Sequence, residues 1–139
     1  MYILEEALAC LAYGVLGMVL MALGYLLVDL LTPGKLHALI WTDKNPNATL
    51  VLAANTLGVA LVVATAVYTS TGSLAEGLTL TCVYGVIGLL LMGLSFVAID
   101  LLTPGKLGAV VTHADLQPAA WINASAHVAV ALVVAAAIS

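Results

Sequence analysis

The chain has 139 residues, of which 64% are hydrophobic and only 7% carry a charged side chain. Soluble domains carry about a quarter of charged residues, so this composition excludes a soluble globular protein and indicates that lipid surrounds most of the chain. The net charge of -4 comes from seven acids and three lysines. Because there is no basic patch, we expect no nucleic-acid partner.

Four apolar runs are long enough to cross a bilayer, which takes about 20 residues of helix. They cover about residues 7–31, 48–68, 78–102 and 119–138, and polar stretches separate them. Backbone groups in lipid must be hydrogen-bonded within their own segment, and strict alternation is absent, so we predict helices. The predicted fold is an all-α bundle of four transmembrane helices in a single membrane domain over residues 1–139.

An internal repeat divides the chain. Residues 29–36 read Asp-Leu-Leu-Thr-Pro-Gly-Lys-Leu and recur unchanged as residues 100–107. We therefore assign repeat one to residues 1–70 and repeat two to residues 71–139. Each repeat holds two spans, so both enter the membrane from the same side. The copies are predicted to be related by a pseudo-twofold axis along the membrane normal, as parallel repeats are.

This duplicated motif closes a first span and is followed by a polar loop and a second span rich in small residues. In these features the chain resembles, over essentially its whole length, the bacterial inner-membrane family catalogued as domain of unknown function 350, the YjfL-like proteins. The resemblance implies a bacterial cytoplasmic-membrane location and no particular activity. Family members are often encoded near envelope-stress proteins of the phage-shock type and near polyamine-synthase-like enzymes. Trp121, Asn123 and His127 depart from the family's more uniformly apolar last span.

The lysines predict the orientation of the spans. Lys35 and Lys44 lie in the first polar loop and Lys106 lies in the third, whereas the second loop contains no base. By the positive-inside rule, the first and third loops are predicted to face the cytoplasm. Both termini and the second loop are then expected outside.

The proline of each motif is expected to end the preceding helix, near Leu31 and near Leu102. The threonine then suits the N-cap of a short interfacial helix on the cytoplasmic surface, with the proline in its first position. The residues of this predicted turn and interfacial helix are Thr32, Pro33, Gly34, Thr103, Pro104 and Gly105.

Asp29 and Asp100 are unusual because a carboxylate in the last turn of a helix opposes the helix dipole. Lys35 and Lys106 offer partners, each within its own repeat or across to the other repeat. One interpretation is an ion or proton site at the cytoplasmic mouth. We favour a turn-locking ion pair or cap, because an acid at the membrane edge costs less than one at the centre.

Deeper polar residues complete the candidate ion or proton site. His127 is about 12 Å into the last span at the helical rise, where a histidine either shuttles protons or forms an interhelical hydrogen bond. A proton relay would run asymmetrically from His127 past Asn123 toward either aspartate. The full candidate set comprises Asp29, Asp100, Lys35, Lys106, Asn55, Asn123 and His127.

Small residues in the first and third spans predict close helix packing, either between these spans or against a second subunit. These residues are Gly14, Gly17, Gly24, Gly85, Gly88 and Ser95. The histidines do not cluster in the sequence, so no metal site and no cofactor are predicted.

No nucleophile, base and metal ligand converge, so an enzyme is not expected. The first functional hypothesis is a structural or partner-binding membrane subunit in bacterial envelope maintenance or stress response. The alternative is a small transporter or channel for protons, small cations or polyamines that uses Asp29, Asp100 and His127. Expected partners are the lipid bilayer and a second copy of the chain, with a dimer favoured, or another membrane protein.

Overall fold

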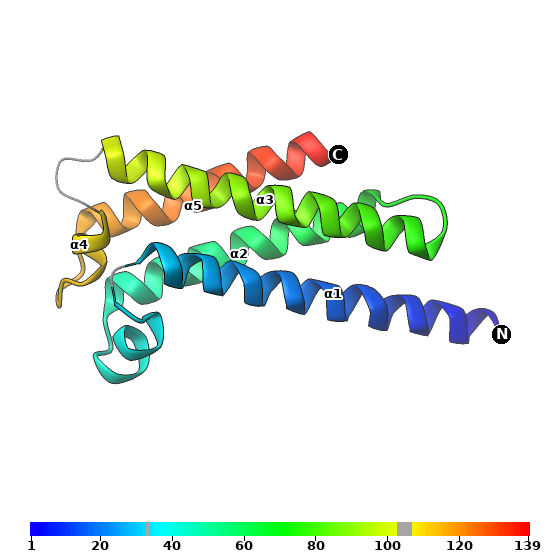
Figure 1. The fold of residues 1–139 in the computed structure, drawn as a ribbon, viewed down its shortest axis with the longest axis horizontal. Helices are drawn as coiled ribbons and strands as arrows, with labels where there is room; N and C mark the ends of the chain where they lie inside the picture. The colour runs from blue at the N-terminus through cyan, green and yellow to red at the C-terminus, as the bar shows by residue number, and fades with distance from the viewer. Residues whose placement is uncertain (33, 103–106) are drawn as a thin grey trace.

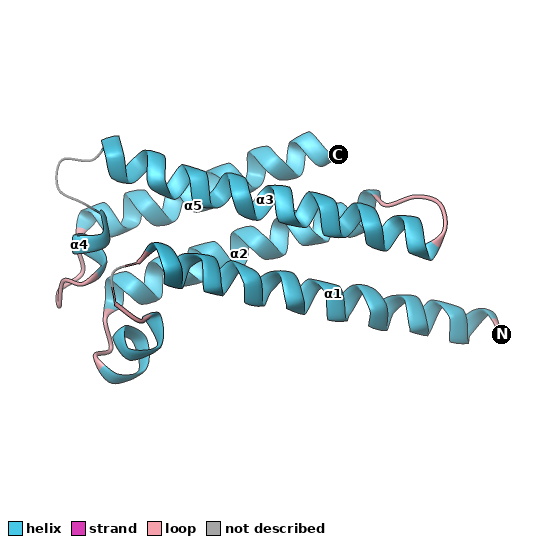
Figure 2. Ribbon diagram, in the orientation of Figure 1, coloured by secondary structure: helices cyan, strands magenta, loops and turns pink. Residues whose placement is uncertain are grey.

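The computed structural model describes residues 1–32, 34–102 and 107–139. These residues form helices and connecting turns, and no strand occurs among them (Figure 2). The elements in chain order are α1 (Tyr2–Leu31), the π-helical turn η1 (Ala38–Thr42), α2 (Pro46–Thr69), α3 (Leu74–Leu102), α4 (Leu107–Val111) and α5 (Pro118–Ile138). Four of them, α1, α2, α3 and α5, are long and apolar enough to cross a membrane, as predicted.

The first and third spans are longer than a bilayer requires. α1 has 30 residues and α3 has 29, which correspond to about 45 Å and 43 Å of helix, against about 30 Å of hydrocarbon. Both end where the proline of the motif predicts, at Leu31 and Leu102. Both begin before their predicted starts, because the helical backbone continues through polar residues such as Glu5 and Glu76 in the first turn. An acid is favourable there, next to the positive end of the helix dipole.

α2 and α5 pack along each other at the centre of the bundle, α1 lies on α2 and α3, and α3 also contacts α5 (Figure 1). α1 and α5 make no comparable contact among the described residues. Gly58 allows the central pair to approach, since a Cβ there would lie 3.0 Å from Ala131 Cβ and 3.3 Å from the His127 carbonyl oxygen. Small residues at such a helix crossing let the two backbones approach closely and pack against each other.

Two apolar clusters fill the interior. The central cluster comprises Leu20, Val59, Val62, Val63, Leu89, Met92, Ala131 and Val134. The loop-side cluster comprises Val28, Leu36, Ala48, Val51, Phe96 and Val111. Because Leu36 follows α1 and Val111 lies in α4, this second cluster anchors the segments after both copies of the motif to the spanning helices.

The segment after α1 begins differently from the prediction. Thr32 was expected to cap a new helix, but it is the C-cap of α1, with an extended ψ of 129 and its N–H bonded to the Val28 carbonyl oxygen. Gly34 then takes a positive φ of 92, and helical backbone resumes only at Leu36. Pro33, Thr103, Pro104, Gly105 and Lys106, which the same prediction involved, lie outside the described residues.

Candidate functional site

Asp29 binds the backbone across the turn that follows α1. Its Oδ1 accepts a hydrogen bond from the Leu36 N–H at 2.7 Å. Hydrogen bonds to an ionised acceptor are stronger than neutral ones, and Leu36 is fully buried, so the carboxylate ties the start of the next helical turn to the end of α1. Lys35 is exposed, and within the described part of the chain no ion pair joins it to Asp29.

Asp100 stands in the last turn of α3 as Asp29 stands in that of α1, and both carboxylates are half-buried. The turn that follows Asp100 includes Lys106 and lies outside the described residues. The predicted choice between pairing within one repeat and pairing across the two repeats therefore stays a prediction for Lys106.

Asn55 lies inside the bundle and is 2% exposed. Its Nδ2 donates to the Gly24 carbonyl oxygen at 3.3 Å, which joins α2 to α1. Gly24 makes room for this approach, since a Cβ there would lie 2.9 Å from Val59 Cγ2 and 3.5 Å from Asn55 Nδ2. The Asn55 Oδ1 has no hydrogen-bond partner among the described residues.

His127 and Asn123 are the most unusual polar residues of the interior. They are 3% and 1% exposed, and they lie four residues apart on α5, so they share one helix face. Neither ring nitrogen of His127 and neither polar side-chain atom of Asn123 has a partner in the described part of the chain. The imidazole instead packs on the Phe96 ring, with centroids 5.8 Å apart. Leaving buried polar atoms unbonded costs free energy.

The loop-side cluster connects the histidine to the region of Asp29. Phe96 packs on His127 and belongs to that cluster, and so does Leu36, whose N–H binds Asp29. The side chains between these two points are apolar. Since the side chains of His127 and Asn123 form no hydrogen bond with a described residue, the described side chains supply no polar chain for the predicted relay.

Asn47 forms a polar link that the sequence did not suggest. Its Nδ2 donates to the carbonyl oxygens of Asp115 at 2.8 Å and His113 at 3.0 Å, and its Oδ1 accepts from the Gln117 N–H at 2.7 Å. Asn45 adds a bond from Nδ2 to the His113 carbonyl oxygen at 2.8 Å. The first loop is thereby bonded to the third, and Asn47 is completely buried.

A local signal for part of this link is visible in the sequence. An asparagine before Pro46 is typical of a helix N-cap followed by proline at the first position. In the structure the Asn45 Oδ1 accepts from the N–H groups of Asn47 and Ala48 at 2.9 and 3.1 Å. Nothing in the sequence near Asn47 identifies its partners, which lie 66 to 70 positions away.

The predicted packing glycines differ in their surroundings. Gly85 faces α1, because a Cβ there would lie 2.5 Å from Leu20 Cδ1, and Gly88 faces α2, at 2.7 Å from Val62 Cγ1. Gly17 faces Val63 Cγ1 at 3.4 Å, and Gly24 lies between α1, α2 and α3. Around Gly14 no described atom lies within 4 Å of a Cβ position. Ser95 is half-buried.

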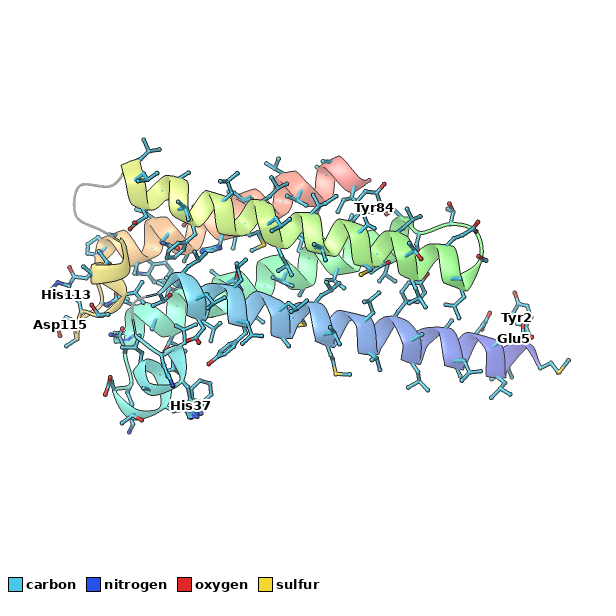
Figure 3. All side chains as sticks on the ribbon, viewed as in Figure 1. Tyr2, Glu5, His37, Tyr84, His113 and Asp115 are labelled. Carbon is cyan, nitrogen blue, oxygen red and sulfur yellow. The ribbon has the colours of Figure 1, made fainter. Side chains whose placement is uncertain are left out.

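No group of three or more His, Cys, Asp or Glu side chains is placed to hold a metal ion in the described ranges. Figure 3 shows His113 and Asp115 close to each other at one end of the bundle and His37 apart from them. Cys10 and Cys82 are exposed free thiols. The described residues bring together no nucleophile with a base.

A helical chain with four candidate spans is a multi-pass transmembrane protein. The family described as Domain of Unknown Function (DUF350) matches residues 2–138, and the chain belongs to this family. This confirms the resemblance seen in the duplicated motif.

The chain is also similar to curated transmembrane proteins. It is 38% identical over 137 residues to a UPF0719 transmembrane protein of Mycolicibacterium paratuberculosis, covering 99% of this chain and 91% of the relative. UPF0719 transmembrane proteins of Mycobacterium bovis and Mycobacterium tuberculosis are 36% identical over 137 residues, covering 99% of this chain and 90% of each relative. No solved structure matches.

Proposed function

We propose that the protein is a non-catalytic membrane subunit that acts by binding another membrane-embedded chain, in the maintenance or stress response of a bacterial envelope. The observation that carries this proposal is that the other helices of the chain bury few residues of α1. That helix buries only Gly17, Leu20, Gly24 and Val28 within its own chain. α2, by comparison, buries ten residues, which are spread from Asn47 to Ala66. A spanning helix that its own chain covers so little offers a long lateral surface to a partner helix.

The polar groups support the same proposal. Asp29 uses its carboxylate to hold a local turn. The His127 ring packs on Phe96, and no described residue bonds its nitrogens. Neither arrangement needs a transported ion to explain it. The described residues also offer no constellation for chemistry.

We further propose the finer topology that the repeat predicts. α1 with α2 and α3 with α5 form equivalent two-helix units around a pseudo-twofold axis along the membrane normal. η1 and α4 are the corresponding interfacial segments, and the loops that contain them face the cytoplasm of a bacterial inner membrane, with both termini outside. Under this symmetry the contact of α2 with α3 would have a counterpart between α1 and α5. Among the described residues α1 and α5 make no comparable contact, so the two units depart from the symmetry here.

Photocrosslinking in intact membranes tests the main proposal. A photoreactive residue at Met18, which is 64% exposed on the outer face of α1, is expected to give a protein adduct of defined mass. Leu20, which is 1% exposed on the inner face, is the matched control position and is expected to give none. Adducts with lipid alone at Met18 and at its outward-facing neighbours would overturn the proposal.

A second candidate, the small transporter or channel, is favoured by one observation. His127 and Asn123 are buried in the middle of α5 with polar atoms that no described residue satisfies. Such atoms suit a site occupied by water or a small cation. The test measures proton, potassium and polyamine flux in liposomes for the natural chain, His127→Ala and the double variant Asp29→Asn, Asp100→Asn. Glu6→Gln, an exposed acid, is the control.

Flux that these variants lose and the Glu6→Gln control keeps would favour the transporter over the subunit. An absence of flux under every gradient would reject the transporter and leave the subunit proposal standing.

A further inference from the structure

α1 extends beyond the rest of the bundle at its N-terminal end. The Tyr13 hydroxyl is hydrogen-bonded to the Ser70 Oγ at 3.0 Å, and Ser70 is the C-cap of α2. Tyr13 is therefore level with the end of α2, and the helix from Tyr2 to Ala12 continues past this level for about 16 Å at 1.5 Å per residue. Figure 1 shows this end of α1 reaching beyond the turn between α2 and α3, and Figure 3 labels Tyr2 and Glu5 on it.

The level of Tyr13 also corresponds to the edge of the hydrocarbon. The turn after α2 contains Ser70 and Ser73, and Glu76 accepts hydrogen bonds from the Ser73 N–H and hydroxyl. An irregular polar turn of this kind is not tolerated against lipid tails. Counting about 20 residues of helix back from Leu31 places the same edge near Ala12. By this count the part of α1 before Tyr13 lies outside the lipid tails, and the span begins about six residues later than the residues 7–31 predicted from the sequence.

Large apolar side chains nevertheless continue along this projecting part. Leu4, Leu8 and Leu11 are 65%, 54% and 65% exposed. Within the spanning part such exposure is ordinary, since lipid covers it. Beyond the edge lipid tails do not reach them, and water or headgroups would surround a row of leucines.

These leucines follow a coiled-coil spacing that continues into the membrane. Leu4, Leu8, Leu11, Val15 and Met18 are separated by intervals of four, three, four and three residues, and all are exposed. We call these five residues the α1 seam. A heptad repeat of apolar residues lets two helices pack side chains into each other's gaps. The intervals put Leu4 and Leu11 at d positions, where leucine is found in parallel two-stranded pairs. The inner face of α1, with Leu20, lies on the opposite side of the helix.

A second copy of the chain fits this seam better than an unrelated partner. Two copies in one membrane share their orientation, so a twofold axis along the membrane normal brings their α1 helices together parallel and in register. Every seam residue then meets its own equivalent, as a closed twofold interface requires. Gly14, beside Val15, has open space around it within its own chain and lets the second helix approach closely. Glu5 and Glu6 lie off the seam.

We propose that the α1 seam binds the same seam of a second copy, forming a parallel helix pair that continues from the membrane into the projecting segment. This inference rests on the proposed subunit function and names the surface and the partner.

Cysteine crosslinking in membranes tests the pairing. In a chain with Cys10→Ser and Cys82→Ser, the variant Leu11→Cys is expected to form a disulfide-linked dimer on mild oxidation, and so is Leu4→Cys. The matched control keeps Cys10 and carries only Cys82→Ser. Cys10 is exposed on the same segment but lies off the seam, and a disulfide needs Cα atoms within about 7 Å. We expect at least several-fold more dimer from Leu11→Cys than from Cys10.

Equal crosslinking of Leu11→Cys and Cys10, or none from either seam position, would overturn the proposal. As a second measurement, the triple variant Leu4→Ala, Leu8→Ala, Leu11→Ala is expected to shift the mass of the solubilised protein from two chains to one with unchanged helix content, because these side chains are exposed. An unshifted mass would also count against the seam. A crosslinked product with a different protein would overturn the self-pairing and leave the subunit function standing, whereas lipid contacts alone would contradict both.

Discussion

The Oδ1 of Asp29 accepts a hydrogen bond from the Leu36 N–H at 2.7 Å, across the turn that contains the Thr-Pro-Gly-Lys part of the motif. The two residues are the first and last of the duplicated eight-residue string. The motif therefore forms a turn whose first and last residues are hydrogen-bonded to each other. Asp29, in the last turn of α1, holds the backbone that follows the helix in place. This explains why a carboxylate occurs at a helix end whose dipole disfavours it.

Removal of the Asp29 carboxylate is predicted to destabilise the protein. Asp29→Ala leaves the buried Leu36 N–H without its acceptor, at a cost of about 1–3 kcal/mol, whereas Asp29→Asn retains an acceptor oxygen and loses less. Thermal unfolding in detergent and amide exchange at Leu36 measure the effect. Asp43→Ala is the control, because Asp43 is exposed in the same loop. Equal stability of Asp29→Ala and Asp43→Ala would contradict the capping role.

Asn47→Ala is predicted to release the third loop from the first. The variant removes the bonds to His113, Asp115 and Gln117, and the loss is expected to reach about 2–4 kcal/mol, since each bond contributes about 1 kcal/mol and buried groups are left unsatisfied. Limited proteolysis near Asp115 and thermal unfolding report it. Thr49→Val, on the exposed side of the same helix, is the control. A third loop as resistant to protease as in the natural chain would refute this prediction.

Gly58→Ala is predicted to force the central helices apart. The added Cβ would lie 2.7 Å from Met92 Cε and 3.0 Å from Ala131 Cβ, and overpacking of this kind costs about 1–3 kcal/mol. The midpoint of thermal unfolding should fall. Leu57→Ala changes the neighbouring residue, which is 68% exposed, and should leave the midpoint unchanged. If the Gly58→Ala protein were as stable as this control, the prediction would be wrong, because the space between α2 and α5 would then accommodate a methyl group.

His127→Leu is predicted to stabilise the protein by about 1–3 kcal/mol, because it replaces two buried ring nitrogens that no described residue bonds with an apolar side chain. Asn123→Val is the companion variant, since it replaces another buried side chain whose polar atoms have no described partner. Both are checked by thermal unfolding in the same detergent. Clear destabilisation by either would mean that these atoms bind water or an ion, which would favour the transporter over the subunit.

Much of the fold was predictable from local properties. The four spans and the ends of α1 and α3 follow from runs of apolar residues and from proline, which act over a few positions of chain. The N-cap at Thr32 was predicted wrongly, since a threonine before proline suits either a helix end or a helix start. In the structure Thr32 ends α1, and the Asp29 carboxylate, not the threonine, accepts a hydrogen bond from the Leu36 N–H.

The sequence by itself determined that this is a membrane protein in which one eight-residue string occurs twice. Hydropathy and sequence identity are both properties of the chain that need no knowledge of contacts. Only the tertiary structure decided that Asn47 bonds the first loop to the third, that Tyr13 lies level with the end of α2, and that the buried His127 ring nitrogens bond to no described residue. These relationships depend on the rotation and relative depth of helices far apart in the chain. Packing of side chains sets both quantities, and an almost uniformly apolar sequence carries little periodicity from which to predict them.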